Sequence, residues 1–253
     1  MIMKVIQQDE IRKNVRERYS EIAKSKSSCC SSKEKSAKLG YTDKELSSVP
    51  DGSNMGLGCG NPSAIASLKK GDVVLDLGSG GGFDCFLASK QVGNSGKVIG
   101  IDMTPDMVSK ARNNAVSGNY HNVEFRLGEI EYLPVADNSI DVIISNCVIN
   151  LSPDKQQVYN EAFRVLKKGG RIVVSDVVAL HELPEEFKKN LEAYSGCLSG
   201  AATVSENKQI LKNAGFSKVD IELKEESKEF IKEWFPGSGA ENYIVSSIIT
   251  AIK

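Results

Sequence analysis

The stretch VVLDLGSGGGF, residues 73–83, decides the fold. Its first five residues form a short apolar run that predicts a buried β-strand. The glycines that follow let the backbone turn sharply and approach a ligand, because a Cβ would collide there. Residues 83–92 then predict a helix. Since Phe83 stands where a dinucleotide-binding G-x-G-x-x-G turn has its third glycine, the pattern here is G-x-G-x-G instead.

Outward from this stretch, the chain alternates between predicted strands and helices. Further strands are expected at 97–101, 123–127, 140–145, 171–178, 218–223 and 243–252, and further helices at 4–24, 105–117, 155–166 and 207–214. Such alternation predicts an α/β fold, a Rossmann-like, seven-stranded and mostly parallel sheet with helices on both faces. The first helix is an N-terminal helical extension to it. Residues 25–38 are expected to form a mobile loop and 50–62 to be irregular.

Composition excludes several classes of protein. The 253 residues carry 32 basic and 33 acidic side chains, and 40% are hydrophobic. This balance excludes disorder throughout and argues against a nucleic-acid binder. The apolar run 243–252 is far shorter than the roughly 18 residues that span a bilayer. Residues 1–17 are charged and resemble no signal peptide, so we expect a cytoplasmic protein. We also expect a monomer without nucleic-acid or membrane partners.

Acidic residues follow the second and third predicted strands, where a doubly wound sheet binds ligands. Asp102 comes 24 residues after Gly78 and suits ribose hydroxyls, and Glu129 follows the third strand. With the motif from Asp76 to Gly82, this set resembles the class I methyltransferases that use S-adenosylmethionine (SAM). The resemblance implies a set of SAM-binding residues: Asp76, Gly78, Ser79, Gly80, Asp102, Met103, Glu129, Ile130 and Asn146. An NAD-type enzyme, or a fold that binds nothing, is the alternative.

The six cysteines are too scattered for a disulfide scaffold, so we expect free thiols in a reducing compartment. No C-x-x-C or H-x-x-x-H spacing is present, which argues against the usual zinc sites. Cys147 ends the fourth predicted strand, at the ligand end of the sheet. Cys59 lies between two glycines in an irregular loop, which is a poor place for a core residue. Cys85, among apolar helix residues, is expected to pack in the core.

The run SNCVINL at 145–151, with PDK at 153–155 and SDV at 175–177, resembles the arsenite methyltransferase family, as do the glycine-flanked turns around Cys59 and Cys197. The resemblance implies that Cys59, Cys147 and Cys197 bind trivalent arsenic. It also implies a further catalytic cysteine in the N-terminal loop, which Cys29 or Cys30 would supply. The domains expected are 1–56, a helix with a cysteine-containing loop, and 57–253, the methyltransferase domain, with an arsenic-binding insert at 180–210.

The chemistry fits these residue types. Soft thiolates select thiophilic centres such as trivalent arsenic. The arsenic lone pair can attack the SAM methyl group directly, so no general base is needed, and the task is to align atoms about 3–3.5 Å apart. The transfer oxidises arsenic, so a thiol reductant of the glutathione or thioredoxin type is expected, with Cys29 or Cys30 forming a disulfide in the cycle. Unproductive arsenic binding, or no role at all, is the alternative for that pair. A small-molecule O- or C-methyltransferase and a non-catalytic metalloid-binding protein are the alternatives.

Overall fold

A computed structural model describes the whole chain except residues 1, 26–28, 185–186, 188–197 and 235–236. The strands are β1 (Val73–Leu77), β2 (Lys97–Asp102), β3 (Val123–Leu127), β4 (Ile140–Asn146), β5 (Leu166–Ala179), β6 (Ser217–Lys224) and β7 (Ile244–Ile252). The α-helices are α1 (Ile2–Lys24), α2 (Cys29–Lys38), α3 (Asp43–Ser47), α4 (Pro62–Ile65), α5 (Phe83–Val92), α6 (Pro105–Ser117), α7 (Lys155–Val165), α10 (Val204–Asn213) and α11 (Lys228–Trp234).

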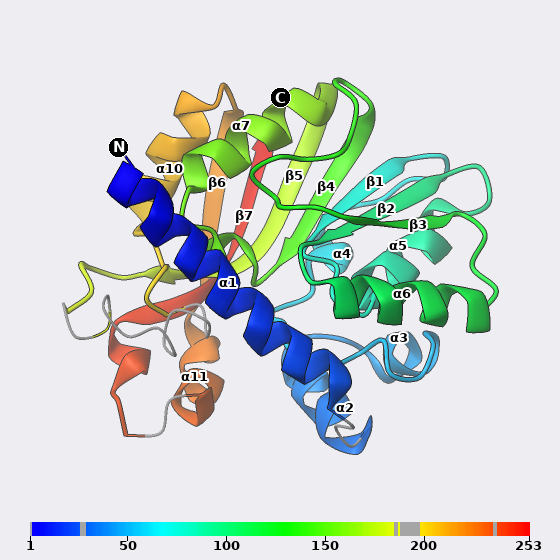
Figure 1. Ribbon diagram of the computed structural model, residues 1–253, viewed down its shortest axis with the longest axis horizontal. Coiled ribbons are helices and arrows are strands. Elements are labelled where there is room, and N and C mark those ends of the chain that lie inside the picture. The colour runs from blue at the N-terminus through cyan, green and yellow to red at the C-terminus, as the bar shows by residue number, and fades with distance from the viewer. Residues whose placement is uncertain (1, 26–28, 185–186, 188–197, 235–236) are drawn as a thin grey trace.

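All seven strands form one sheet in the order β3-β2-β1-β4-β5-β7-β6 (Figure 1). The first five strands in this order are parallel, whereas β7 runs antiparallel to both β5 and β6. The prediction of a seven-stranded, mostly parallel sheet is therefore confirmed. The chain order reverses between β1 and β4, and at such a point the loops diverge and leave a crevice at the carboxyl ends of the strands.

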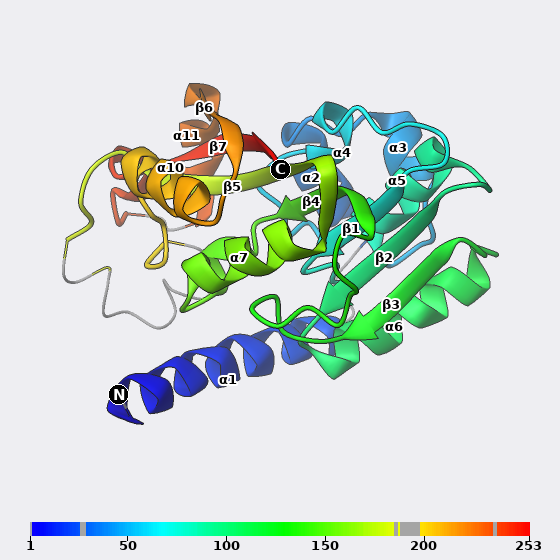
Figure 2. The ribbon, with the colours of Figure 1, turned by 90° about the horizontal axis from the view of Figure 1, so that it is seen from above.

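Helices cover both faces of the sheet, as predicted (Figure 2). Alternate residues of one strand enter different cores: Leu75 packs in a cluster with Tyr159 of α7, whereas Val74 packs in a cluster with Phe86 of α5. A strand buried on both faces must be apolar at every position, which explains the continuous apolar runs of β1 and β4. These two cores hold the strand ends rigidly in place.

Helix α1 lies across the ligand end of the sheet and packs on α6 (Figure 1). Ser20 donates a hydrogen bond to Asp106 of α6, and Lys24 forms an ion pair with the same carboxylate at 3.1 Å. The prediction of a mobile loop at 25–38 is wrong for 29–38, which form α2. Lysine, glutamate and alanine in this segment are good helix formers and outweigh its serines.

Strand β5 also differs from its prediction, since it begins at Leu166 rather than at 171. The sequence KKGG at 167–170 reads as a turn, but its backbone pairs with the end of the chain. Gly169 donates a hydrogen bond to the Lys253 carbonyl, and Lys253 donates one to the Gly170 carbonyl, both at 2.9 Å. Tertiary pairing has thus overridden a local turn signal.

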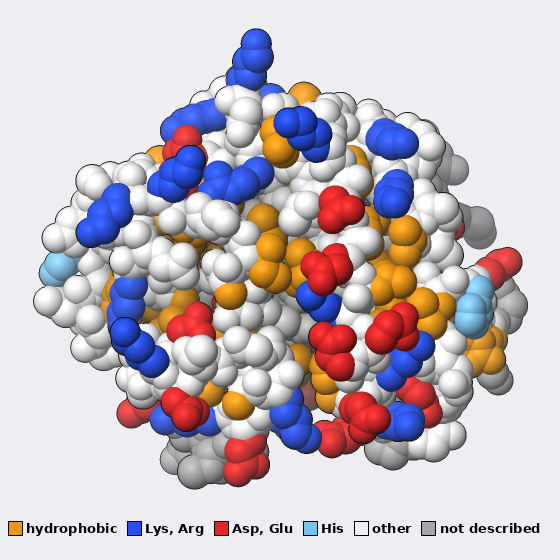
Figure 3. All heavy atoms as spheres, turned by 180° about the vertical axis from the view of Figure 1, so that it is seen from behind, with side chains coloured by type: hydrophobic (Ala, Val, Ile, Leu, Met, Phe, Trp, Pro, Cys, Tyr) orange, Lys and Arg blue, Asp and Glu red, His pale blue; other side chains and the backbone are white. Residues whose placement is uncertain are grey.

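The described helices include none that is both long and apolar enough to cross a bilayer. Acidic and basic side chains are both spread over the face shown in Figure 3, in keeping with the net charge of −1.

Candidate functional site

A cleft with about 1060 Å³ of empty space opens at the carboxyl ends of β1 and β4, beneath α1. We call it the central cleft. The glycine turn after β1, Asp102 and Met103 after β2, Ile130 after β3, and Asn146 and Cys147 at the end of β4 all line it. Helix α1 closes the cleft with Arg12, Val15 and Tyr19. Residues that the sequence placed at separate strand ends therefore share one cavity.

The glycine turn after β1 leaves room for other groups to approach its backbone closely. The backbone amides of Gly78 and Ser79 both donate to the Ile101 carbonyl, at 2.8 and 2.9 Å, and so tie the turn to the end of β2. Gly78 has φ +72°, and a Cβ there would lie 2.5 Å from the Val148 side chain. No other residue type fits this position, which is the physical reason for glycine there.

Asp102 is turned into the central cleft and anchored by backbone amides. Its carboxylate accepts hydrogen bonds from the amides of Gly80, at 3.0 Å, and Thr104, at 2.8 Å. Burial raises the pKa of Asp102, and these two hydrogen bonds partly offset that rise. A half-buried carboxylate with unused acceptor sites beside a glycine turn is suited to bind ribose hydroxyls.

Two acids follow β3, and the structure places them differently. Glu131 lines the central cleft with Ile130, while Glu129 is absent from the described lining and its side chain is 33% exposed. Arg12 of α1 lies 3.5 Å from the Glu129 carboxylate and 3.2 Å from that of Glu131. Glu131 also accepts a hydrogen bond from Ser152 at 2.7 Å. These contacts fasten α1 over the cleft, a connection that strand periodicity gave no sign of.

A second group that sequence reasoning missed consists of Tyr41 and Asp84, which meet Asn146. The Tyr41 hydroxyl donates to Asp84 at 2.7 Å, and the Asn146 amide nitrogen donates to the other carboxylate oxygen at 3.1 Å. Burial raises the pKa of Asp84 to about 6, against the lowering effect of these two hydrogen bonds. The one available signal was an acid two residues after the last glycine of the turn, which reads equally well as an ordinary first-turn helix acid.

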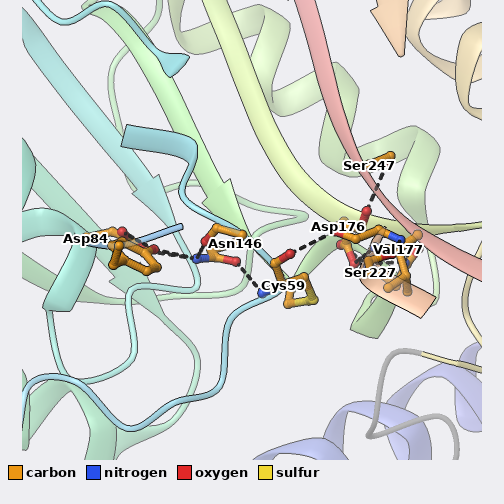
Figure 4. The surroundings of a disulfide bond; sticks show 12 residues. Cys59, Asp84, Asn146, Asp176, Val177, Ser227 and Ser247 are labelled. Atoms are coloured by element: carbon orange, nitrogen blue, oxygen red, sulfur yellow. Dashed lines mark hydrogen bonds between the residues drawn. A yellow bond between two sulfur atoms is a disulfide. The ribbon is translucent and has the colours of Figure 1, made fainter. Parts of the chain in front are cut away.

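Asn146 also holds the loop that carries Cys59 (Figure 4). Its side-chain oxygen accepts the Cys59 backbone amide at 2.8 Å, and its nitrogen donates to the Gly60 carbonyl at 2.8 Å. A Cβ on Gly58 would lie 2.6 Å from the same amide group. The glycines beside Cys59 thus allow this loop to lie against the end of β4.

Cys59 and Cys147 meet beside this junction. The structure pairs the two side chains, with their Cα atoms 5.6 Å apart. The two sulfurs and a carboxylate oxygen of Asp176 all lie within 4.8 Å of one another. Cys147 has φ +56°, in the left-handed region that non-glycine residues rarely adopt. Such strain often accompanies functional positions.

A second cavity, which we call the outer hollow, has about 1210 Å³ of empty space and adjoins the central cleft. Residues of α1, α2, α11 and the 56–59 loop line it, including Cys59, Phe230 and Trp234. Cys147 lines both the central cleft and the outer hollow. Cys147 therefore stands where the two cavities meet, and Cys59 lies on the side of the outer hollow.

The structure says less about the other cysteines of the predicted site. Cys197 lies outside the described residues, although the next residue, Leu198, packs in one cluster with Cys59 and Cys147. Cys29 and Cys30 begin α2. Cys85 is fully buried, as predicted, and donates a hydrogen bond to Asp76 at 3.2 Å.

The strand order, the glycine turn after β1 and the anchored acid after β2 define a class I methyltransferase, a class that takes its methyl group from SAM. Residues 68–215 match the family described as "Methyltransferase domain". This confirms the predicted class and its methyl donor.

The chain belongs to the arsenite methyltransferase family. It is 47% identical to the arsenite methyltransferase of Halobacterium salinarum over 97% of this chain and 67% of that protein. It is 38% identical to the arsenite methyltransferase of Mus musculus over 82% of this chain and 58% of the relative. These alignments span about two thirds or less of the relatives' length. The crystal structure of CrArsM, an arsenic(III) SAM methyltransferase from Chlamydomonas reinhardtii, superposes with a TM-score of 0.65 at 33% identity, over 85% of this chain and 72% of that one.

Proposed function

We propose that this chain transfers the SAM methyl group to trivalent arsenic held by Cys59, Cys147 and Cys197. The observation that carries the proposal is the position of Cys147, which lines the central cleft and the outer hollow at once. SAM in the central cleft and arsenic arriving through the outer hollow would meet at this sulfur. Membership of the arsenite methyltransferase family supports the same substrate.

In this proposal, arsenic binds three thiolates and keeps its lone pair. The lone pair attacks the methyl carbon, the carbon–sulfur bond breaks toward the SAM sulfur, and S-adenosylhomocysteine (SAH) leaves. The protein supplies alignment, since the reacting atoms must approach within about 3–3.5 Å. Asn146, which bridges the end of β4 and the Cys59 loop, is suited to keep that alignment.

The same proposal includes a thiol reductant of the glutathione or thioredoxin type. Methyl transfer formally removes two electrons from arsenic, and two thiols that pair as a disulfide return them. Arsenic binds thiolates, so Cys59 and Cys147 must both be reduced before they can bind it. Cys29 or Cys30, at the start of α2, would be the fourth thiol of the cycle. We further propose that the chain acts as a cytoplasmic monomer, with arsenic bound by the 57–253 domain and its 180–210 insert.

The direct test is mass spectrometry of arsenic species after incubation of the reduced chain with arsenite, SAM and a thiol reductant. Methylated arsenic in molar excess over protein, with matching SAH, is expected. Arsenic bound without methylation, in a chain that binds SAM, would refute the proposal and favour a metalloid-binding protein. Methylation of an added phenol or amine but not of arsenite would favour a small-molecule methyltransferase.

A further inference from the structure

The cysteine pair has a third buried neighbour that the arsenic chemistry proposed above does not use. One carboxylate oxygen of Asp176 and the Sγ atoms of Cys59 and Cys147 all lie within 4.8 Å of one another (Figure 4). Ligands of one tetrahedral zinc ion are roughly 3.6–3.8 Å apart, since zinc–sulfur bonds are about 2.3 Å and zinc–oxygen bonds about 2.0–2.2 Å long. The three donors are therefore close enough to share one ion. They come from a loop, the end of β4 and the interior of β5, so no local spacing in the sequence could reveal them.

The Asp176 carboxylate is held in a fixed orientation with one acceptor site left. Its Oδ1 accepts hydrogen bonds from the Asn150 side-chain amide at 2.9 Å and the Val177 backbone amide at 2.8 Å. Its Oδ2 accepts the Asn150 backbone amide at 3.2 Å. Each carboxylate oxygen has two acceptor sites, so these three described donors leave one site, on Oδ2. Carboxylates that bind metals are hydrogen-bonded in this way by surrounding groups, which fix their direction.

The charge of this donor set indicates which ion suits it. Trivalent arsenic bound by three thiolates is neutral, so it needs no carboxylate. Two thiolates and an ionised carboxylate carry three negative charges, and burying them is costly unless a cation balances them. Asp176, Cys59 and Cys147 are each no more than 6% exposed. A thiophilic divalent cation such as Zn²⁺ or Cd²⁺ offsets most of this charge and accepts both thiolate and carboxylate ligands.

A cation can reach the cluster through the central cleft. Cys147 lines that cleft, and Arg12 is the one basic residue in its described lining. Arg12 is paired with Glu131. The acids of the same lining are Asp76, Asp84, Asp102 and Glu131. A cleft with an excess of negative charge raises the local concentration of cations, so it favours their access to Cys147.

We propose that reduced Cys59 and Cys147, together with Asp176, form a binding site for one thiophilic divalent cation of the zinc class. The two thiols release their protons to solvent as the ion binds, and its fourth position stays open to water. Asn150 is a positioning residue, because it acts on the ion through Asp176. The site itself does not depend on methyl transfer. Its consequence rests on the proposed function, since an ion that holds both thiolates excludes arsenic and should inhibit methylation competitively with arsenite.

The test titrates the reduced chain with Co²⁺, whose absorption reports thiolate ligands and which Zn²⁺ displaces from such sites. We expect one Co²⁺ bound through thiolates, released by Zn²⁺, and lost in Cys147→Ser. Asp176→Asn should lower the affinity for Co²⁺ by at least roughly 10-fold and leave the affinity for arsenite unchanged. Asp220→Asn, at an exposed acid of β6, is the matched control and should change neither affinity.

Arsenite binding, measured on the same preparations, separates this inference from the proposed function. Co²⁺ binding that Asp176→Asn leaves unchanged would overturn the site, as would a reduced chain that binds arsenite but no Co²⁺. Equal loss of both ligands in Asp176→Asn would give Asp176 a purely structural role and would also overturn it. Co²⁺ bound at the cluster of a chain that binds no arsenite would support the site and refute the proposed function.

A second measurement covers the case in which Asp176→Asn does not fold. Infrared difference spectra are taken of the unsubstituted, reduced chain, labelled with ¹³C at its aspartate side-chain carboxyls, before and after Zn²⁺ is added. Zn²⁺ should shift the band of one aspartate carboxylate, whereas arsenite should shift none. Bound Zn²⁺ without any such shift would overturn the inference.

Discussion

The glycine-turn side of the central cleft and the thiol junction around Cys59 and Cys147 are built by different means. The first is assembled from residues directly after neighbouring parallel strands, whose relative positions follow from the sheet. The second joins a loop to a strand end 88 residues further along the chain, through the side chain of Asn146. The glycine-turn side of the central cleft therefore depends on the backbone register of the sheet, whereas the thiol junction depends on a few side-chain contacts.

The largest expected effect is a loss of arsenic methylation from a substitution at the thiol junction alone. Cys147→Ser removes a proposed arsenic ligand at the meeting point of the two cavities, so arsenic methylation should fall by roughly two orders of magnitude or more. SAM affinity should change little, because the glycine turn and Asp102 are untouched. Steady-state arsenic speciation and SAM calorimetry on the same preparation measure both quantities.

Cys85→Ala is the matched cysteine control. Its thiol is buried in α5 and bonded to Asp76 rather than to the thiol junction, so the variant should still bind arsenic with unchanged stoichiometry. If Cys147→Ser methylated arsenic as fast as the unsubstituted chain, the proposed ligand set would be wrong.

The second prediction is a loss of SAM binding from a substitution on the glycine-turn side alone. Asp102→Ala removes an anchored carboxylate that should bind the ribose, and the loss of SAM binding should be about 1.5–3 kcal/mol, as for a hydrogen bond between a charged and a neutral group. Calorimetry with SAM measures it. Arsenic bound per chain in the absence of SAM should stay the same, and a drop in that stoichiometry would show that the two sides are not separable.

These contrasts also explain what could be predicted from the sequence. The bounds of β1, β3, α5 and α6 agree with those expected from apolar runs and glycine signals, because these elements are buried and regular. The 29–38 helix and the start of β5 were missed, because weak local signals there gave way to helix propensity and to pairing with the chain end.

Of the site residues, those that directly follow strands could be predicted from the sequence, and those from other segments could not. Asp102 and Cys147 follow strands, so their place at the sheet end could be inferred. Tyr41 and Arg12 come from helical or irregular segments whose docking on the sheet no spacing reveals, and spacing alone does not show that Glu131 lines the cleft. Tyr41 and Asp84 are 43 residues apart in the sequence. Their contact depends on how the folded chain packs, which the sequence pattern does not reveal.

The third prediction concerns the helix that covers the cleft. Arg12→Met leaves the buried Glu131 carboxylate without its cation, so the free energy of unfolding should fall by about 1–3 kcal/mol. Lys13→Met is the matched control, because Lys13 pairs with Glu17 on the exposed side of the same helix and such pairs contribute about 0–1 kcal/mol. Chemical denaturation distinguishes them, and equal effects would mean that Arg12 does not fasten α1.

The smallest expected effect is a pH dependence on the cofactor side. The pKa of Asp84 is raised to about 6 in the folded chain, above its ordinary value of about 3.9 in the unfolded chain. The folded state therefore binds more protons between about pH 4 and pH 6, and its stability falls as the pH rises through that window. Asp84→Asn should remove this fall and gain on the order of 1–2 kcal/mol relative to the unsubstituted chain from pH 4 to pH 6.

Denaturation of both ligand-free chains at several pH values measures that difference. Groups common to the two chains cancel, including the acids whose pKa is lowered by ion pairs, such as Glu124. A difference that stayed constant from pH 4 to pH 7 would show that Asp84 is not the buried, titrating carboxylate described above.

The most direct test of the central claim is arsenic X-ray absorption on the reduced chain loaded with one equivalent of arsenite. Arsenic held at the thiol junction predicts three sulfur neighbours, and one sulfur fewer in Cys147→Ser. Arsenic surrounded by oxygen, or a sulfur shell that Cys147→Ser leaves unchanged, would contradict the claim that these thiols present arsenic to the central cleft.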